Sequence, residues 1–156
     1  MREVAGSNPV VPTILPNMKL PDLASLPEHL KAIGFISGEE IAWKQEDCAE
    51  AIDWLRRNEY AVLGIELWII ESGNVRTAIH TDAGAELYVT SCDPIKGETW
   101  PDYVERSAHE AGDAISAFHW PIDALGPPRP VHFNLCWADR DWFRANSKYD
   151  AYFIDK

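Results

Sequence analysis

The stretch Ala61-Val-Leu-Gly-Ile-Glu-Leu-Trp-Ile-Ile-Glu71 decides the fold of this chain. Its residues are apolar on both sides of a two-residue alternation, with Glu66 as the exception. One side carries Leu63, Ile65, Leu67 and Ile69, and the other carries Val62, Gly64, Glu66, Trp68 and Ile70. A strand that is apolar on both sides belongs in the middle of a covered sheet. The rest of the chain must supply that cover.

The composition indicates one acidic globular domain. The chain has 156 residues, of which 46% are hydrophobic, and carries 25 acidic against 14 basic residues for a formal net charge of −11. This charge makes binding to nucleic acid or to an anionic membrane unfavourable, and it makes a cationic partner the natural complement. The alternative interpretation is that the acidic residues serve only to keep the protein soluble.

The cysteines and the chain ends indicate the cellular compartment. Cys48, Cys92 and Cys136 are odd in number, far apart and set in apolar patterns, which favours buried thiols in a reducing compartment. The chain has neither an N-terminal export signal nor an 18-residue apolar window. We therefore expect a cytoplasmic protein without a membrane span.

The chain divides into a Pro-rich arm at residues 1–27 and a single α+β domain at residues 28–156. Five prolines in the arm exclude a helix of useful length. Apolar periodicity predicts two main helices, at about 45–58 and 101–118, the second with Thr99 as its N-cap.

Three further strands are predicted from residue alternation. Residues 75–81 and 86–92 follow the central strand as an antiparallel meander, and residues 131–137 form a fourth strand. The predicted fold class is α+β, an antiparallel sheet of four to six strands with the two main helices packed on one face and the Pro-rich arm against it.

Glu66 is the most unusual residue of the central strand, because an unpaired buried carboxylate costs several kcal/mol. An internal ion pair with Arg76 across the hairpin is the favoured explanation, and a role at a binding surface is the other. A small enzyme or ligand-binding domain with a site near Glu66, His80 and Cys92 stays open as an alternative function.

No stretch carries a strong catalytic or metal-binding signature. The chain lacks G-x-S-x-G, P-loop, G-x-G-x-x-G, H-E-x-x-H and C-x-x-C motifs. Glu105, His109 and Asp113 share one helix face at steps of four, but solvated faces of amphipathic helices show the same pattern. We therefore predict no metal, no cofactor and no catalytic residue.

Aromatic residues gather near the predicted element ends, where side chains can anchor a protein partner. Trp100 and Tyr103 would form an interface centre if acidic residues surround them; lids over a small core are the alternative. The acidic residues that would form this rim are Asp93, Asp102, Glu105, Asp139 and Asp141.

Three motifs together resemble Immunity protein 40, a bacterial immunity-protein family of polymorphic toxin systems. They are Leu63-Gly-Ile-Glu-Leu-Trp68, Trp100-Pro-Asp-Tyr-Val-Glu-Arg-Ser107 and Phe133-Asn-Leu-Cys-Trp137, and Ile41-Ala-Trp43 fits the same pattern. The resemblance covers roughly residues 41–142. It implies a non-enzymatic protein that binds and neutralises a cognate toxin, and it gives no catalytic residues to carry over.

The resemblance and the charge together predict the partner and the surface. The expected partner is a cationic cognate toxin domain, with a nuclease as the suggested class, bound by a monomer or weak homodimer without nucleic acid. The predicted toxin-binding residues are Asp93, Trp100, Asp102, Tyr103, Glu105, His109, Asp113, Asp139 and Asp141. A regulatory module that binds a host protein through residues 1–27 is a third possibility.

Overall fold

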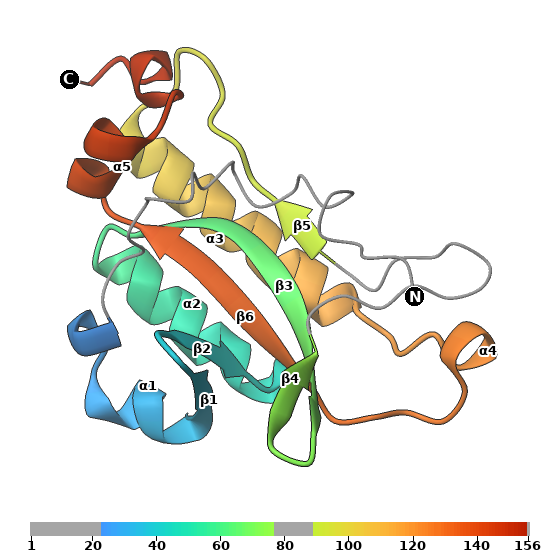
Figure 1. Cartoon of the computed structure of the whole chain (residues 1–156). Helices are drawn as coiled ribbons and strands as arrows, with labels where there is room; N and C mark the ends of the chain where they lie inside the picture. Colours follow the sequence, from blue (N-terminus) through green and yellow to red (C-terminus); the bar gives the residue numbers. More distant parts are fainter. Residues whose placement is uncertain (1–22, 77–88, 156) are drawn as a thin grey trace.

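The structure is a computed structural model that describes residues 23–76 and 89–155 (Figure 1). Most of the Pro-rich arm predicted at residues 1–27 therefore lies outside the described residues. The helices are α1 (Glu28–Ile33), α2 (Cys48–Arg57), α3 (Trp100–Ala117), α4 (Ile122–Leu125) and α5 (Arg140–Asn146). The strands are β1 (Gly34–Ser37), β2 (Glu40–Trp43), β3 (Ala61–Glu71), β4 (Asn74–Arg76), β5 (Val89–Ser91) and β6 (Val131–Ala138).

The strands form one antiparallel sheet in the order β1-β2-β6-β3-β4, with β5 also paired to β3. β3 lies inside the sheet, as its two apolar sides predict. Helices α2 and α3 pack on one face of the sheet (Figure 1). The predicted α+β class, the central strand and the two main helices are thus confirmed.

The predicted meander is wrong, because β5 pairs with β3 rather than with β4. Ile69 of β3 lies opposite Arg76 of β4, and Glu66 of β3 lies opposite Val89 of β5. Ile69 and Glu66 are only three residues apart on β3, whereas their partners Arg76 and Val89 are separated by the whole segment 77–88. Among the described residues, β4 and β5 pair with successive parts of β3. Most of the predicted strand 75–81, and residues 86–88 of the next one, lie outside the described residues.

A β-bulge changes the side-chain pattern near the start of β3. The register against β6 shifts between Val62 and Gly64, and such a shift moves side chains to the opposite face. Val62 therefore joins Ile65 in the core under α2 and α3, whereas Leu63 packs in a second core. The predicted grouping of Leu63 with Ile65 is wrong for this reason.

Ser107 of α3 accepts the hydrogen bond that the bulge would otherwise leave unmade. The backbone N–H of Val62 donates to Ser107 Oγ at 3.0 Å, and Ser107 Oγ donates to the carbonyl of Val104 at 3.1 Å. Ser107 is fully buried, so its hydroxyl satisfies a backbone group that water cannot reach.

The second core joins the C-terminal segment to the start of α3. Its members are Ala61, Leu63, Trp100, Tyr103, Val104, Cys136, Ala138, Phe143 and Phe153. Asp155 extends this attachment, because both of its carboxylate oxygens accept from the backbone N–H of Trp100 at 2.9 Å. Thr99 Oγ1 accepts from the N–H of Asp102 at 3.2 Å, which confirms the predicted N-cap.

Two smaller expectations concern the cysteines and the membrane. Cys48, Cys92 and Cys136 are buried and unbridged, which confirms the predicted buried thiols. Within the described residues, no helix combines the length and the apolar character that crossing a bilayer requires.

Ser107→Ala should lower the free energy of unfolding by about 1–3 kcal/mol, because the N–H of Val62 would stay buried without an acceptor. Urea unfolding checks this, with an unchanged m-value as evidence that the native state persists. Ser116→Ala, at an exposed position of the same helix, is the matched control. Equal midpoints for the two variants would contradict the assignment.

Candidate functional site

The outer face of α3 carries four of the predicted toxin-binding residues. Asp102, Glu105, His109 and Asp113 are exposed on one stripe of the helix, on the side away from the sheet. Glu105 accepts from Arg56 of α2 at 3.0 Å, and His109 Nε2 lies 3.2 Å from Asp113 Oδ2. Exposed ion pairs of this kind contribute little stability. The stripe is therefore an acidic surface that faces solvent and that the fold does not need for its stability.

Trp100 and Tyr103 do not belong to that surface. Trp100 is 5% exposed and Tyr103 is fully buried, with its hydroxyl donating to the carbonyl of Cys92. Both side chains therefore pack in the second core instead of standing exposed among acidic residues. Trp100, Tyr103, Val104 and Ser107 recur at helical spacing on the face of α3 that packs inward, and that spacing already indicated burial.

A cleft lies where the end of α2, the start of α3, α5 and the C-terminal tail meet. We call it the α3–α5 cleft. Its volume is about 380 Å³. The residues that line it are Asn58, Glu59, Tyr60, Trp100, Pro101, Asp139, Arg140, Asp141, Arg144 and Asp155. Pro101 precedes Asp102, so the cleft continues directly into the acidic stripe of α3.

The charges that line the cleft are mixed, but both cations are already paired. Arg140 forms an ion pair with Asp150 and lies over the rings of Trp100 and Phe153. Arg144 lies 3.1 Å from Asp141. Among the described residues, the remaining carboxylates of the lining form no ion pair; they are those of Glu59, Asp139 and Asp155.

Asp139 and Asp155 also have local structural roles. Asp139 caps α5, because its Oδ1 accepts from the N–H of Trp142 at 2.7 Å. Asp155 caps α3 through Trp100. Negative charge near the N-terminus of a helix is favourable, so part of the acidity of the cleft is explained by helix capping.

Glu59 reaches the cleft through the turn that ends α2. Its N–H donates to the carbonyl of Arg56, and the N–H of Tyr60 donates to the carbonyl of Leu55, which is a Schellman motif. Glu59 adopts φ 61° at the position where glycine is usual. Trp54 stacks on Tyr60, and Trp100 Nε1 donates to the Glu59 carbonyl at 3.1 Å. These contacts hold a residue in a conformation that its side chain disfavours.

The alternative site near Glu66, His80 and Cys92 is not assembled among the described residues. Glu66 lies opposite Asn134 on the sheet face away from the helices, whereas the Cys92 thiol donates to Glu110 of α3 at 3.0 Å. His80 lies outside the described residues. Burial raises the pKa of the Cys92 thiol to about 12, with the Glu110 hydrogen bond adding to the rise. Cys92 is therefore protonated at neutral pH and is not an activated nucleophile.

Arg106 connects Cys92 to the half-buried carboxylate of Glu98, on the loop before α3. Its Nε and Nη2 donate to the two oxygens of Glu98 at 2.7 and 3.0 Å, and its Nη1 donates to the Cys92 sulfur at 3.2 Å. Burial acts to raise the pKa of Glu98, but the bonds from Arg106 and from the N–H of Ile95 outweigh it and hold that pKa below its usual value. This cluster is an internal brace.

Arg76 pairs with Glu71 rather than with Glu66. The register places Arg76 opposite Ile69, and its Nη1 lies 3.4 Å from Glu71 Oε2. Arg129 also donates to Glu71, at 2.7 Å. Hydrogen bonds from Arg129 hold the pKa of Glu71 below its usual value, against a smaller opposing effect of burial. Arg76 therefore forms an ion pair at the hairpin, but its partner is Glu71 and not the predicted Glu66.

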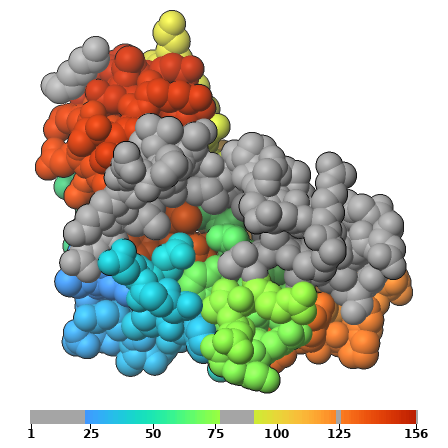
Figure 2. All heavy atoms as spheres, in the orientation of Figure 1, coloured from blue at the N-terminus to red at the C-terminus, as the bar shows by residue number. Residues whose placement is uncertain are grey.

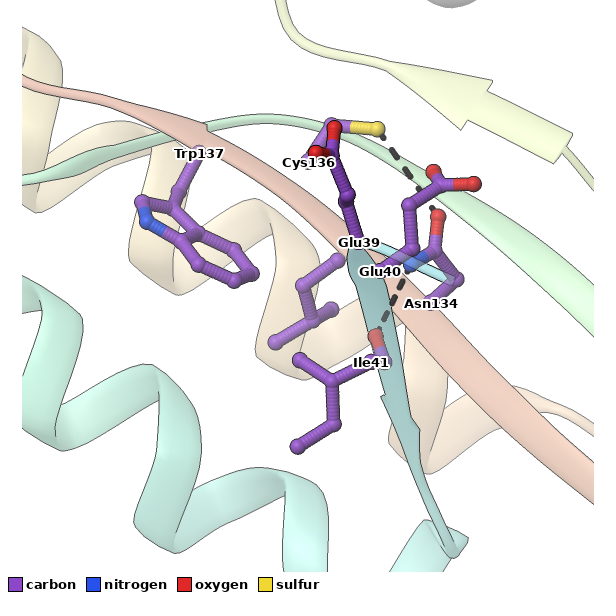
Figure 3. Close-up of a pocket in the computed structure, with 7 residues that line it drawn as sticks. Glu39, Glu40, Ile41, Asn134, Cys136 and Trp137 are labelled. Atoms are coloured by element: carbon purple, nitrogen blue, oxygen red, sulfur yellow. Dashed lines mark hydrogen bonds between the residues drawn. The ribbon is translucent and has the colours of Figure 1, made fainter. Parts of the chain in front are cut away.

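A second, much smaller pocket lies where β2 diverges from β6 (Figure 3). The side-chain amide of Asn134 donates to the carbonyl of Ile41 at 2.8 Å across the gap. The volume of about 20 Å³ has room for about one water molecule. Across the described residues, no group of three or more His, Cys, Asp or Glu side chains is arranged to hold a metal ion.

The predicted residues thus fall into separate sets. The α3 stripe holds four of them, Asp139 and Asp141 lie across the cleft at the start of α5, and Asp93 is exposed after β5. Sequence reasoning missed Glu59, Arg140 and Asp155. The predicted helix ended just before Glu59 without a glycine to terminate it, and this absence was a usable signal. The contact by which Asp155 caps α3 joins residues far apart in the sequence, so no local pattern indicated it.

The comparisons with known proteins identify the family. The model of the Immunity protein 40 family matches residues 29–124, which is more than half of the chain. The chain belongs to the Immunity protein 40 family. Immunity proteins of this kind bind cognate toxins. The comparisons with curated proteins and with solved structures found no match.

The family match covers the stripe of α3 but only part of the α3–α5 cleft. It includes residues 58–60 and 100–101 of the lining and ends before β6 and α5. The motif at Phe133–Trp137, which contributed to the resemblance, lies beyond the matched range. One wall of the cleft in this Immunity protein 40 family member therefore comes from the segment outside the match.

The bond between Glu98 and Arg106 should make stability depend on pH. The folded pKa of Glu98 lies below its usual value of 4.5, so its contribution is complete above that value and is lost as pH falls through the lowered pKa. Between about pH 5 and pH 3, unfolding free energy should fall more steeply for the wild type than for Glu98→Gln. Glu39→Gln, at an exposed turn, is the control. Parallel profiles for wild type and Glu98→Gln would count against this bond.

Glu59→Gly should raise the free energy of unfolding by about 0.5–1 kcal/mol, because glycine adopts positive φ without steric cost. Glu59→Ala removes the same charge but keeps the strained backbone, and we expect no comparable gain from it. Denaturant unfolding of the two variants separates the effects. Equal gains would show that charge, rather than backbone conformation, sets the stability at this position.

Proposed function

We propose that this chain neutralises a cognate toxin domain of a bacterial polymorphic toxin system by direct binding in the cytoplasm. Membership of the Immunity protein 40 family is the observation that carries this proposal. The protein acts without catalysis and without a cofactor. It works as a monomer or weak homodimer, and its partner is the toxin protein rather than nucleic acid.

The acidic stripe of α3 is the proposed contact surface for the toxin. Asp102, Glu105 and Asp113 are exposed on a rigid helix, and the net charge of −11 adds a long-range attraction for a cationic partner. A nuclease is a fitting class of toxin, because its phosphate-binding site is positively charged. Asp93, Asp139 and Asp141 extend this acidic surface at its edges.

The direct test captures the toxin and then measures protection. The chain serves as bait in lysate of its source cells, and each retained protein is expressed by itself and together with the chain. The proposal expects a retained protein that stops growth when expressed by itself and is harmless in the presence of the chain. Capture of proteins without such toxicity would overturn the proposal.

The contact surface is tested by the triple variant Asp102→Asn, Glu105→Gln, Asp113→Asn. We expect its affinity for the captured toxin to fall about tenfold at low ionic strength, mainly through slower association, with a weaker dependence on salt. The control carries Glu28→Gln, Glu39→Gln and Asp123→Asn, which remove the same charge from exposed positions on other elements. If both triple variants lose affinity equally, net charge rather than the α3 stripe governs binding.

A further inference from the structure

The α3–α5 cleft differs from the stripe of α3 because it is an open hollow that can receive a side chain. Its volume of about 380 Å³ corresponds to roughly a dozen water molecules. Trp100, Tyr60 and Pro101 form part of its walls. A cleft of this size that opens beside a docking surface can receive one long side chain from the partner.

The charged residues that line the cleft indicate whether that side chain should be positive or negative. Arg140 and Arg144 are paired with Asp150 and Asp141. The carboxylates of Glu59, Asp139 and Asp155 form no ion pair among the described residues. Asp139 and Asp155 already accept backbone N–H bonds at helix N-termini, but only a cationic side chain would add an opposite charge to the three carboxylates as the cleft loses water.

The three carboxylates come from different elements, which favours a cation that can form hydrogen bonds in several directions. Glu59 comes from the end of α2, Asp139 from the start of α5 and Asp155 from the C-terminal tail. They therefore approach the cleft from different elements. A planar guanidinium with five N–H donors can bond to several acceptors at once, whereas a lysine ammonium is a compact point charge.

We infer that the α3–α5 cleft seats an arginine side chain of the toxin, beside the contact made by the α3 stripe. This inference rests on the proposed function and names the group that the site recognises. The wall formed by α5 and the C-terminal tail lies outside the family match, so two of the three carboxylates, those of Asp139 and Asp155, belong to the part of the chain that the family model does not describe.

The test uses N-acetyl-arginine amide as a probe of the full chain, followed by NMR at the Trp100 indole N–H and the Glu59 amide. We expect saturable shifts at both groups, with a dissociation constant on the order of 1–10 mM for so small a ligand. N-acetyl-citrulline amide has nearly the same shape without the charge and should produce no saturable shift. N-acetyl-lysine amide should bind more weakly than the arginine probe.

The variant Glu59→Gln, Asp139→Asn removes two charges and keeps the cap of α5, because asparagine caps helices as well as aspartate does. It should weaken probe binding about tenfold. The control Glu39→Gln, Asp123→Asn removes the same charge elsewhere and should bind normally. Asp123 lies on α4, at the opposite end of the molecule from α5 (Figures 1 and 2).

Three results would overturn the inference: an equal response to citrulline, a stronger response to lysine, or unchanged binding in the Glu59→Gln, Asp139→Asn variant. The proposed function fails separately, if the chain gives no protection from any toxin that it captures. Protection that persists without arginine-specific binding would leave the immunity function standing and remove the cleft from it.

Discussion

The hydrogen bond between the Val62 N–H and Ser107 Oγ is the contact on which the arrangement of the molecule depends. It stabilises the bulge in β3, and the bulge sends Val62 and Leu63 to different cores. The first core supports α2 and α3 against the sheet. The second core receives the rings of Phe143 and Phe153 and so positions α5 and the C-terminal tail. Both walls of the α3–α5 cleft follow from this division.

The acidic composition of the chain has several separate causes. Glu98 and Glu71 are paired with arginines, and Asp139 and Asp155 cap helices. These carboxylates would be useful in any protein of this fold. The exposed acids of α3 have weaker local reasons, because surface pairs contribute little stability. Net charge therefore overstates the acidity available to a partner, and the structure shows where that acidity is concentrated.

Local patterns predicted most of the fold and little of the site. Helical periodicity located α2 and α3, and the two apolar sides of β3 placed it inside the sheet. The bulge escaped prediction because its acceptor, Ser107, is distant in sequence. The pairing of β5 with β3 escaped prediction because alternation cannot tell which strand a segment pairs with. The burial of Trp100 was predictable, since it shares the helical spacing of Val104 and Ala108.

The centre of the sheet is completed only after β6 has been synthesised. β2 and β3 do not pair with each other; each pairs with β6, which is synthesised after both of them. Until then both strands carry an unpaired edge, and the core beneath α3 lacks Phe133 and Leu135. A chain that has not yet reached β6 therefore lacks part of the packing that holds α3 against the sheet.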